Sequence, residues 1–260
     1  MDKLIFIYYV FGTYTKYVPF CIYGILKSYP NTFVKVYIQG KMKPNEKESL
    51  KYIESNNYEI KENYFNNVGF NKNKISGGVG KVLRWIIPYE ELKDFDYAYI
   101  GDIDMLIVKE EPNLLESHIN HIGKIELPFS NGIRKCGTRL SGLHFIDIHK
   151  YYDKVNDYIN RCISDITFLN QEVKDIDNNE KFLYNMIKKN IGFNEKIKTH
   201  KYRPHHGAHI GLFRSKNLNV RKKIQEIPPY IFDDNFNSIL KLINVKEIIE
   251  LKEYYKKYIR

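Results

Sequence analysis

The sequence predicts an α/β fold, in which a mostly parallel central sheet is flanked by helices and followed by a helical extension at the C-terminus. Two patterns lead to this prediction. Short apolar runs alternate with segments of helical period in the N-terminal part of the chain. The C-terminal part is rich in Lys and Glu and has apolar residues at helical spacing. With 260 residues, the chain is long enough to bury a substantial core.

The elements of the N-terminal part follow from their apolar patterns and breakers. The apolar run over residues 3–10 predicts a buried strand, and residues 16–28 predict a helix that must stop at Tyr29-Pro30. We expect the elements after it to be a strand over Val34–Ile38, a helix over Pro44–Ser55, a strand over Tyr58–Ile60, a loop over Asn66–Gly80, a helix over Val79–Leu92 kinked at Pro88, and a strand over Tyr97–Ile100.

The second half of the chain is less regular. We expect strands over Ile122–Phe129 and Gly142–Ile148, helices over Tyr151–Ile163 and Glu180–Lys189, and a pair of helices over Asp233–Arg260. This pattern predicts one domain over residues 1–215 and an extension over residues 216–260 that packs on it. The alternative interpretation of the extension is a basic amphipathic surface that binds an anionic membrane peripherally.

The composition limits the class of partner. Lys and Arg number 41 against 31 Asp and Glu, so the net charge of +10 favours phosphate-bearing ligands, nucleic acid or anionic membranes. The alternative is that the lysines only solvate the surface. The basic residues are scattered rather than gathered in a stripe, which argues against a nucleic-acid partner. The 22 tyrosines cannot all be buried, and exposed aromatic rings suit surfaces that stack on ligands.

The cysteines and the N-terminus predict the compartment. Cys21, Cys136 and Cys162 are far apart and odd in number, which is typical of a reducing compartment rather than a disulfide framework. The N-terminal apolar run lacks a cleavage site, and no apolar run is long enough to span a membrane. We therefore expect a cytoplasmic protein, at the inner face of a membrane if the extension binds lipid.

Two carboxylates mark the end of the predicted strand over Tyr97–Ile100. Asp102 and Asp104 stand one residue apart, directly after Gly101, at the edge of the sheet where open α/β folds bind ligands. Two close carboxylates repel each other unless a positive charge lies beside them, and Mg²⁺ or Mn²⁺ is the usual solution. A cation held this way can clamp a diphosphate. The alternative is an ordinary acidic turn after a strand.

A cationic pair precedes these carboxylates. Lys81 and Arg84 are three residues apart at the start of the predicted helix over Val79–Leu92, so they share one helical face. The free N–H groups of a helix start also favour anions. The pair is thus a candidate for the phosphate side of a metal–diphosphate complex, and the alternative is two solvated basic residues.

Three of the eight histidines are concentrated in one short loop. His205, His206 and His209 lie between Arg203 and Arg214, and the loop also contains Gly207 and Gly211. Imidazole is a good ligand for Mn²⁺ and similar ions, and arginine matches phosphate geometry. The pattern indicates a metal or phosphate loop, although the histidines alone do not decide which of them binds.

Two small polar segments are candidates for holding a sugar. Ser141-Gly142 precedes an apolar strand and leaves room near the backbone, and Asn179-Glu180 opens a helix with hydrogen-bonding groups for hydroxyls. The alternatives are a plain strand entry and a plain helix cap.

The order of these pieces resembles the GT-A glycosyltransferases, and within them the family-eight type of lipooligosaccharide galactosyltransferases and glycogenin. The resemblance is strongest from Arg84 through Asp102-Ile103-Asp104 to Leu106, with Gly101 in place of a more usual residue, and extends more weakly from residue 3 to about 214. It implies a GT-A fold and a nucleotide-sugar donor, for which a UDP-sugar is the first choice. It also implies Mn²⁺ or Mg²⁺ as the cofactor and a glycan, lipid-linked or protein-linked sugar as the acceptor, in cell-surface glycan assembly.

The resemblance also implies roles for matched positions. Asp102, Asp104 and His209 would hold the metal, with His206 as the alternative ligand because the His209-Ile210-Gly211 spacing is one residue shorter than in the family. Asn179-Glu180 would stand beside the anomeric carbon, where the family has Asp-Gln. The residues implied to contact the nucleotide-sugar are Tyr8, Tyr9, Val10, Gly12, Lys81, Arg84, Gly101, Asp102, Ile103, Ser141, Gly142, Asn179, His206, Gly211 and Arg214.

The leading hypothesis is therefore a metal-dependent glycosyltransferase with Asp102, Asp104, Glu180 and Arg84 as catalytic residues. The resemblance alone favours retention of anomeric configuration. If the enzyme inverts, the candidate bases are Glu126, Asp147 and Glu180. The rival hypotheses are a metal-dependent phosphohydrolase or nucleotidyltransferase and a basic nucleic-acid-binding module.

Overall fold

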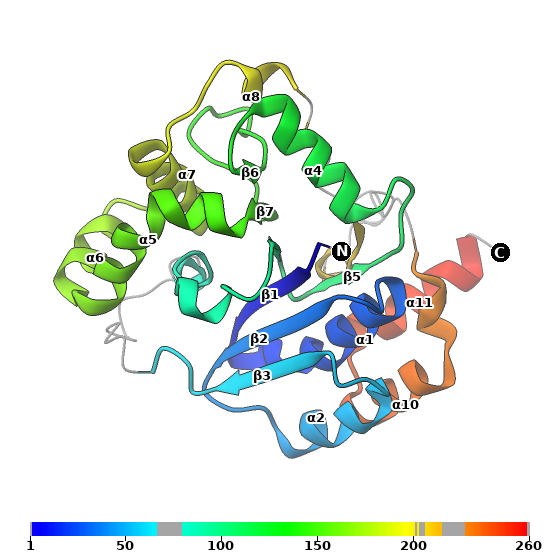
Figure 1. Cartoon of the computed structure of the whole chain (residues 1–260). Helices are drawn as coiled ribbons and strands as arrows, with labels where there is room; N and C mark the ends of the chain where they lie inside the picture. The colour runs from blue at the N-terminus through cyan, green and yellow to red at the C-terminus, as the bar shows by residue number, and fades with distance from the viewer. Residues whose placement is uncertain (1, 67–79, 201, 203–205, 215–226, 259–260) are drawn as a thin grey trace. The chain divides into compact units, whose positions relative to one another are not determined.

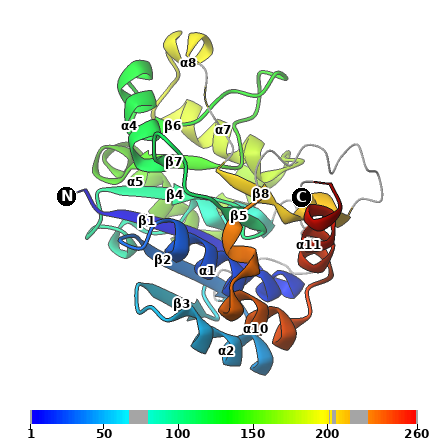
Figure 2. The ribbon, with the colours of Figure 1, turned by 90° about the vertical axis from the view of Figure 1, so that its right-hand side faces the viewer.

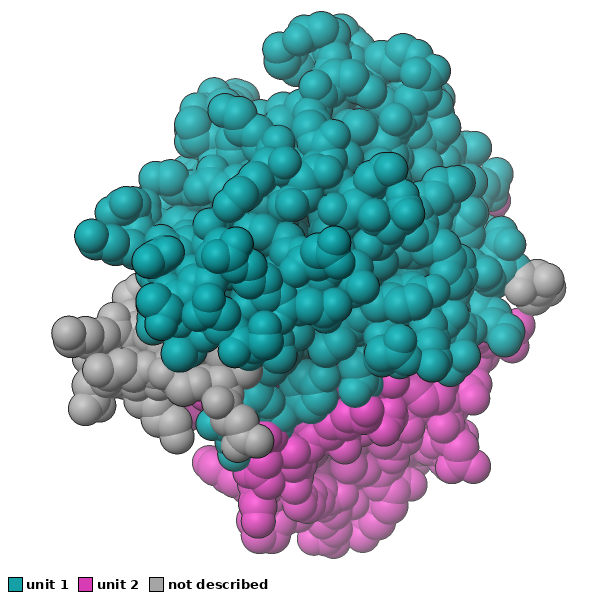
Figure 3. Space-filling model, turned by 60° about the vertical axis from the view of Figure 1, so that its left-hand side comes forward, with its two compact units in different colours: residues 1–9, 64–101, 112–204 teal, residues 10–63, 102–111, 205–260 magenta. Residues whose placement is uncertain are grey.

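The computed structural model describes residues 2–66, 80–200, 202, 206–214 and 227–258. The chain divides into two compact units, which Figure 3 shows in different colours. The first unit contains residues 1–9, 64–101 and 112–204, and the second contains residues 10–63, 102–111 and 205–260.

The first unit contains one part of the β-structure. Strand β1 (Leu4–Phe11), most of which belongs to this unit, pairs in parallel with β4 (Tyr97–Ile100). Strand β7 (His144–Asp147) is antiparallel to both β4 and the short β6 (Phe129–Ser130), so the order is β1-β4-β7-β6. Strand β1 forms because its residues are apolar on both faces, and every residue from Leu4 to Val10 is buried.

Four helices of the first unit, α4 to α7, start at side-chain caps. Asn113, Asp147, Asp165 and Asn178 each accept a hydrogen bond from a backbone N–H of the helix that follows. Figure 1 shows α4, α5 and α7 in the same part of the molecule as β6 and β7. The helices are α4 (Leu114–Ile125), α5 (Ile148–Ser164), α6 (Ile166–Val173), α7 (Asn179–Asn190) and α8 (Lys196–Thr199).

Two predictions in this unit are wrong. The predicted strand over Ile122–Phe129 is mostly the last part of α4, because Asn113 caps a helix whose buried residues are Leu114, His118, His121 and Ile125. These four residues share one helical face, but two of them are polar and do not look like core in the sequence. Only Phe129 of that segment belongs to a strand.

The predicted kinked helix over Val79–Leu92 is replaced by two 3₁₀ turns. These are η3 (Lys81–Trp85) and η4 (Tyr89–Glu91). Pro88 has an extended backbone and no N–H to donate, so the helical turns cannot join across it. Most of the predicted loop over Asn66–Gly80 lies outside the described residues.

The second unit contains two further strand pairs. Strands β2 (Phe33–Gln39) and β3 (Tyr58–Glu62) are parallel, with Val36 opposite Ile60. Strands β5 (Met105–Ile107) and β8 (Gly207–His209) are antiparallel, with Met105 opposite His209, and they lie side by side in Figure 2. The α/β class with parallel pairing of its long strands and flanking helices is therefore confirmed.

The helices of the second unit include the predicted C-terminal pair. Helix α10 packs on α1 and α2, and α11 packs on η5. None of the helices in the described part of the chain combines the length and the apolar character needed to cross a bilayer. The helical elements are η1 (Gly12–Tyr17), α1 (Val18–Ser28), α2 (Pro44–Ser49), η2 (Leu50–Ile53), η5 (Ile210–Arg214), η6 (Pro229–Phe232), α10 (Asp234–Ile243) and α11 (Lys246–Tyr258).

Candidate functional site

Strand β4 ends at Gly101, as the sequence predicts. The Gly101 N–H donates to the carbonyl of Ile7, and its own carbonyl accepts a hydrogen bond of 3.2 Å from Nη1 of Arg84. A Cβ at this position would lie 3.0 Å from the ring of Tyr99, so the strand end is tightly packed. Asp102 is the next residue, and its carbonyl accepts from the Met105 N–H in a turn that enters β5. The two carboxylates therefore occupy a turn between two buried strands.

Asp104 lies in the second unit with two of the residues predicted to act beside it. Its carboxylate is 5% exposed, and it accepts a hydrogen bond of 2.7 Å from Nη2 of Arg214. Nε2 of His209 lies 3.3 Å from the other carboxylate oxygen. The pairing of β5 with β8 brings these residues together, because it sets Met105 opposite His209 and lets the Ile210 N–H donate to the Asp104 carbonyl.

Electrostatics keep this carboxylate ionised. Burial alone would raise the pKa of Asp104, but the hydrogen bonds and charges of His209 and Arg214 lower it to about 2. Burial alone would lower the pKa of His209, but Asp104, and to a smaller extent Asp102, raise it above its ordinary value. Asp102 is thus close enough to act on the imidazole of His209 electrostatically.

The donor atoms around Gly211 fit a divalent cation. A Cβ at Gly211 would lie 2.9 Å from both Oδ2 of Asp104 and Nε2 of His209 and 3.3 Å from Nη1 of Arg214, so glycine leaves a space that these three side chains border. Carboxylate oxygen and imidazole nitrogen are ligands that Mn²⁺ accepts. Within the described residues no three His, Cys, Asp or Glu side chains already form a metal cluster. The structure thus brings two of the three predicted ligands together, and the role of Asp102 as the third remains a prediction.

Arg214 is held by more than the carboxylate. Its Nη1 donates to the hydroxyl of Tyr14 at 2.9 Å and its Nη2 to that of Tyr17 at 3.1 Å. Its Nε lies 3.7 Å from Glu247 of α11. The guanidinium is therefore fixed in place next to Asp104, and its three other partners were not predicted from the sequence.

Another histidine of the loop, His206, has a different partner from His209. His206 is completely buried, and its Nδ1 lies 2.5 Å from the buried carboxylate of Glu110. The structure thus pairs His206 with Glu110, whereas it pairs His209 with Asp104. Arg203 and His205 lie outside the described residues.

In the first unit, Arg84 contacts other residues that are predicted to bind the nucleotide-sugar. Its guanidinium is buried, donates from Nη2 to Oδ1 of Asn179 at 2.7 Å, and lies 4.2 Å from the centre of the Trp85 ring. The indole N–H of Trp85 donates to the carbonyl of Asn179 at 3.0 Å. These contacts tie η3 to the start of α7 and, through the Gly101 carbonyl, to the end of β4.

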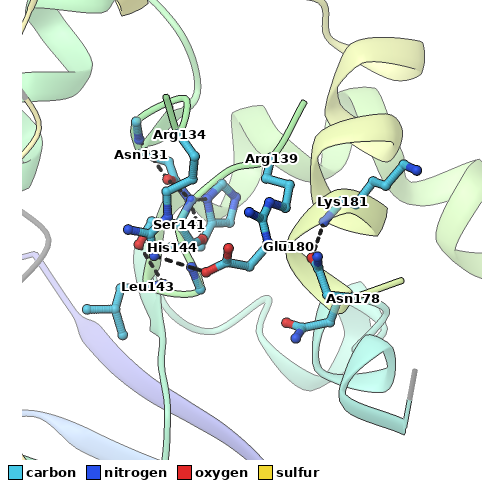
Figure 4. Close-up of polar contacts among 12 residues, drawn as sticks. Asn131, Arg134, Arg139, Ser141, Leu143, His144, Asn178, Glu180 and Lys181 are labelled. Carbon is cyan, nitrogen blue, oxygen red and sulfur yellow. Dashed lines mark hydrogen bonds and ion pairs between the residues drawn. The ribbon is translucent and has the colours of Figure 1, made fainter. Parts of the chain in front are cut away.

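Glu180 is anchored beside the Ser141-Gly142 turn, and Figure 4 shows its carboxylate with Arg134 and Arg139 beside it. Its Oε1 accepts hydrogen bonds of 3.0 Å from both the Gly142 N–H and Nη2 of Arg134. The two segments predicted to hold a sugar therefore meet, and they do so through a direct contact of carboxylate with backbone.

Asn131 fixes this turn from the other side. Its Oδ1 accepts from the Gly132 N–H at 2.6 Å and the Ser141 N–H at 2.9 Å. Its Nδ2 donates to the Ser141 carbonyl and to Nδ1 of His144, both at 3.0 Å (Figure 4). Because Nδ1 of His144 accepts, the proton of the neutral ring is on Nε2. Neither Asn131 nor His144 was predicted; the only signal is the Asn-Gly pair, which is typical of a turn.

The three candidate bases differ in their surroundings. Asp147 caps α5 and forms an ion pair of 2.7 Å with Lys150. Glu126 ends α4 in the left-handed conformation and pairs with Lys196. Glu180 alone among the three contacts the residues predicted to hold the sugar. Among the three candidate bases, the geometry therefore favours Glu180, and its role as a base stays a prediction.

The other predicted nucleotide contacts lie along two segments. Tyr8, Tyr9 and Val10 are buried in β1, and Gly12, with φ of +61°, begins η1. Ile103 is buried in the turn after β4, and Lys81 begins η3. Their contact with a nucleotide remains a prediction.

No family model and no curated protein matches this chain. Among solved structures, it is similar to the galactosyltransferase LgtC in complex with donor and acceptor sugar analogues, with 12% identity over 69% of this chain and 69% of that chain and a TM-score of 0.47. GlyE, a glycosyltransferase of Streptococcus pneumoniae TIGR4, has 11% identity over 99% of this chain and 64% of its own, with a TM-score of 0.49. Core-mannan synthase A of Aspergillus fumigatus in an Mn/GDP form has 7% identity over 72% and 70%, with a TM-score of 0.45. Each of these three solved structures is that of a glycosyltransferase or a glycan synthase.

Proposed function

We propose that this chain is a glycosyltransferase that moves a sugar from a nucleotide-sugar to a glycan or glycoconjugate acceptor. The observation that supports this most is the contact of Asp104 with both His209 and Arg214 around Gly211. It provides an anionic ligand, an imidazole and a phosphate-matching guanidinium at one place. That place follows directly in sequence on the strand end that Arg84 binds.

The residues that we propose to act on the diphosphate belong to the second unit. Asp104 and His209, with Asp102, hold Mn²⁺ or Mg²⁺. A bound cation of this kind stabilises the negative charge that develops on the leaving diphosphate. Arg214 supplies a fixed positive charge for the same oxygens, and Tyr14 and Tyr17 keep its guanidinium oriented.

The residues that we propose to act on the donor sugar belong to the first unit. Arg84 orients Asn179 through its Oδ1, which leaves the amide N–H₂ of Asn179 available to a sugar hydroxyl. Glu180 is held at the Gly142 N–H, so its carboxylate keeps a constant position. We propose that the donor is a UDP-sugar and that the transfer retains configuration; both choices are supported by the resemblance to the family-eight enzymes.

The test is calorimetric titration with UDP, GDP and CMP, with and without Mn²⁺. We expect the wild-type protein to bind one nucleotide in a metal-dependent way, and we expect Asp104→Ala to weaken this binding at least tenfold because the cation loses its buried carboxylate. The matched control is Asp153→Ala, which removes a carboxylate that pairs only with Lys154 at the surface and should leave binding unchanged.

Two results would contradict the proposal. One is the absence of metal-dependent binding for all three nucleotides. The other is turnover of a phosphoester without a sugar donor, which would assign the same residues to a phosphohydrolase or nucleotidyltransferase.

A further inference from the structure

We propose that a cavity in the first unit binds the neutral, terminal part of an oligosaccharide acceptor; its role as the acceptor site depends on the proposed function. The cavity has a volume of about 840 Å³. It is lined by a hairpin (residues 131–141), by Tyr184 of α7, by residues of the segment 193–200 and by Tyr202. The hairpin is closed by an isolated bridge between Ile133 and Leu140.

Aromatic rings provide the contact surface. Tyr184 and Phe193 have ring centres 4.9 Å apart, at an interplanar angle of 30°, and both rings are partly exposed. Tyr202 adds a third ring, which is fixed because its hydroxyl donates to the Leu143 carbonyl at 2.9 Å. A Cβ at Gly132 would lie 3.2 Å from Cβ of Tyr202, so glycine permits this close packing. The apolar face of a pyranose packs well against such rings, while its hydroxyls face polar groups.

The charges of the cavity indicate that its ligand is neutral. Arg134 pairs with Glu180 at 3.0 Å, and Lys198 pairs with Glu195 at 2.8 Å. Each Lys or Arg among the described lining residues therefore already has a carboxylate partner. A phosphate, sulfate or nucleic acid requires cations whose charge is available. Paired charges instead offer donors and acceptors to hydroxyl groups.

The cavity adjoins the residues that we propose to hold the donor sugar. Ser141 lines the cavity, and the next residue, Gly142, donates its N–H to Glu180. Arg134 both lines the cavity and binds the same carboxylate oxygen, as Figure 4 shows. A sugar in the cavity thus lies next to the turn that holds Glu180, which is where an acceptor must lie if its hydroxyl is to receive the transferred sugar.

The volume also bears on the length of the ligand. Pockets of roughly 300–1,000 Å³ enclose most of a drug-sized molecule, and a disaccharide is of that size. The cavity is therefore large enough for more than a single sugar ring.

The test is a glycan array that carries neutral, sulfated, phosphorylated and sialylated oligosaccharides. We expect the wild-type protein to be retained by a set of neutral oligosaccharides. We expect Phe193→Ala and Tyr184→Ala to reduce this retention at least tenfold, whereas Tyr184→Phe keeps the ring and should bind as the wild type does. Phe232→Ala removes an exposed ring from the second unit and serves as the matched control.

The same preparations are titrated with the nucleotides and Mn²⁺ as above, and their thermal unfolding is recorded to verify folding. Retention by acidic oligosaccharides only, by no oligosaccharide, or to an equal degree after loss of the rings would overturn the inference even if a nucleotide binds. Ring-dependent glycan binding without any nucleotide binding would overturn the proposed function and the acceptor role, and would leave a glycan-binding cavity without transfer.

Discussion

At the scale of single residues, the chain uses neutral polar groups to orient charged ones. Asn131 binds both backbone groups of Ser141 and also sets the tautomer of His144. His144 is completely buried, and burial together with the charge of Arg84 lowers its pKa to about 3. The ring is therefore neutral over the physiological range of pH.

The buried ring makes a prediction about stability. The folded state resists protonation of His144 until the pH reaches about 3, whereas an unfolded histidine takes up a proton below its usual pKa of 6.5. The contribution of His144 to stability is thus complete above pH 6.5 and is lost as the pH falls, at a slope of about 1.4 kcal/mol per pH unit. Urea unfolding of the wild type and His144→Gln between pH 8 and pH 4 measures this slope as the difference between the two proteins. Equal slopes would show that His144 does not titrate as argued, and the difference at pH 8 isolates the lost contacts.

The exposed thiol of Cys136 makes a second prediction. A hydrogen bond from Arg139, followed by one from the Thr138 backbone, lowers the pKa of the Cys136 thiol to about 7. We expect the rate of alkylation by iodoacetamide to rise with a midpoint near pH 7 and to shift to higher pH in Arg139→Ala. Cys21 and Cys162 are buried and should stay unmodified in the native protein, which provides an internal reference. A wild-type midpoint equal to that of the variant would contradict the assigned role of Arg139.

At the scale of elements, the outcome of sequence-based prediction depends on whether a pattern is local. Strands β1 and β4 were predicted because they are continuous apolar runs, and α5 because its apolar residues follow a helical period. Helix α4 was missed because His118 and His121 are core residues, each bonded to the hydroxyl of Ser130. A histidine that is buried because it bonds to a serine of another element is still a polar residue, so it leaves no periodic apolar signal in the sequence.

In the candidate site, too, local features could be predicted from the sequence and contacts between distant segments could not. Asp104, His209 and Arg214 were named from the sequence because their residue types indicate the chemistry, and the structure brings them together. Glu247 and Tyr17, which also bind Arg214, were not named, because their approach depends on how distant segments pack. The chemistry of a residue can be inferred from the sequence, but the further side chains that it contacts can be identified only once the fold is known.

The start of α7 makes a prediction at this scale. Asn178 caps the helix by accepting from the Lys181 N–H, and the next two residues are Asn179 and Glu180. We expect Asn178→Ala to lower the free energy of unfolding by about 1 kcal/mol. We also expect it to weaken binding of the nucleotide-sugar whose base the titration identifies, because the first turn of α7 is loosened.

The matched control is the equivalent cap of α4, Asn113, which accepts from the Glu116 N–H. Asn113→Ala should cost a similar free energy of unfolding and leave nucleotide-sugar affinity unchanged. Thermal unfolding and calorimetry on both variants separate the two effects. Equal loss of affinity in the two variants would mean that general destabilisation, and not the position of Glu180, explains the result.

At the scale of the whole molecule, both units contain residues that the proposed transfer requires. The first unit holds the turn that we propose to bind the sugar and the proposed acceptor cavity, and the second holds Asp104 with its partners. The chain passes from one to the other between Gly101 and Asp102, in the middle of the stretch that resembles the family-eight enzymes. The division of the chemistry between the units was not evident from the sequence, because the units interleave along the chain.

Arg214 links the C-terminal extension to Asp104 through charge contacts. The guanidinium is shared between Asp104 and Glu247, and Glu247 also binds Lys16 at 3.2 Å. A change of charge on α11 therefore reaches the candidate cation ligand through a single side chain. The extension is thus not a detachable module in the electrostatic sense: its first turn belongs to the same network of charges as Asp104.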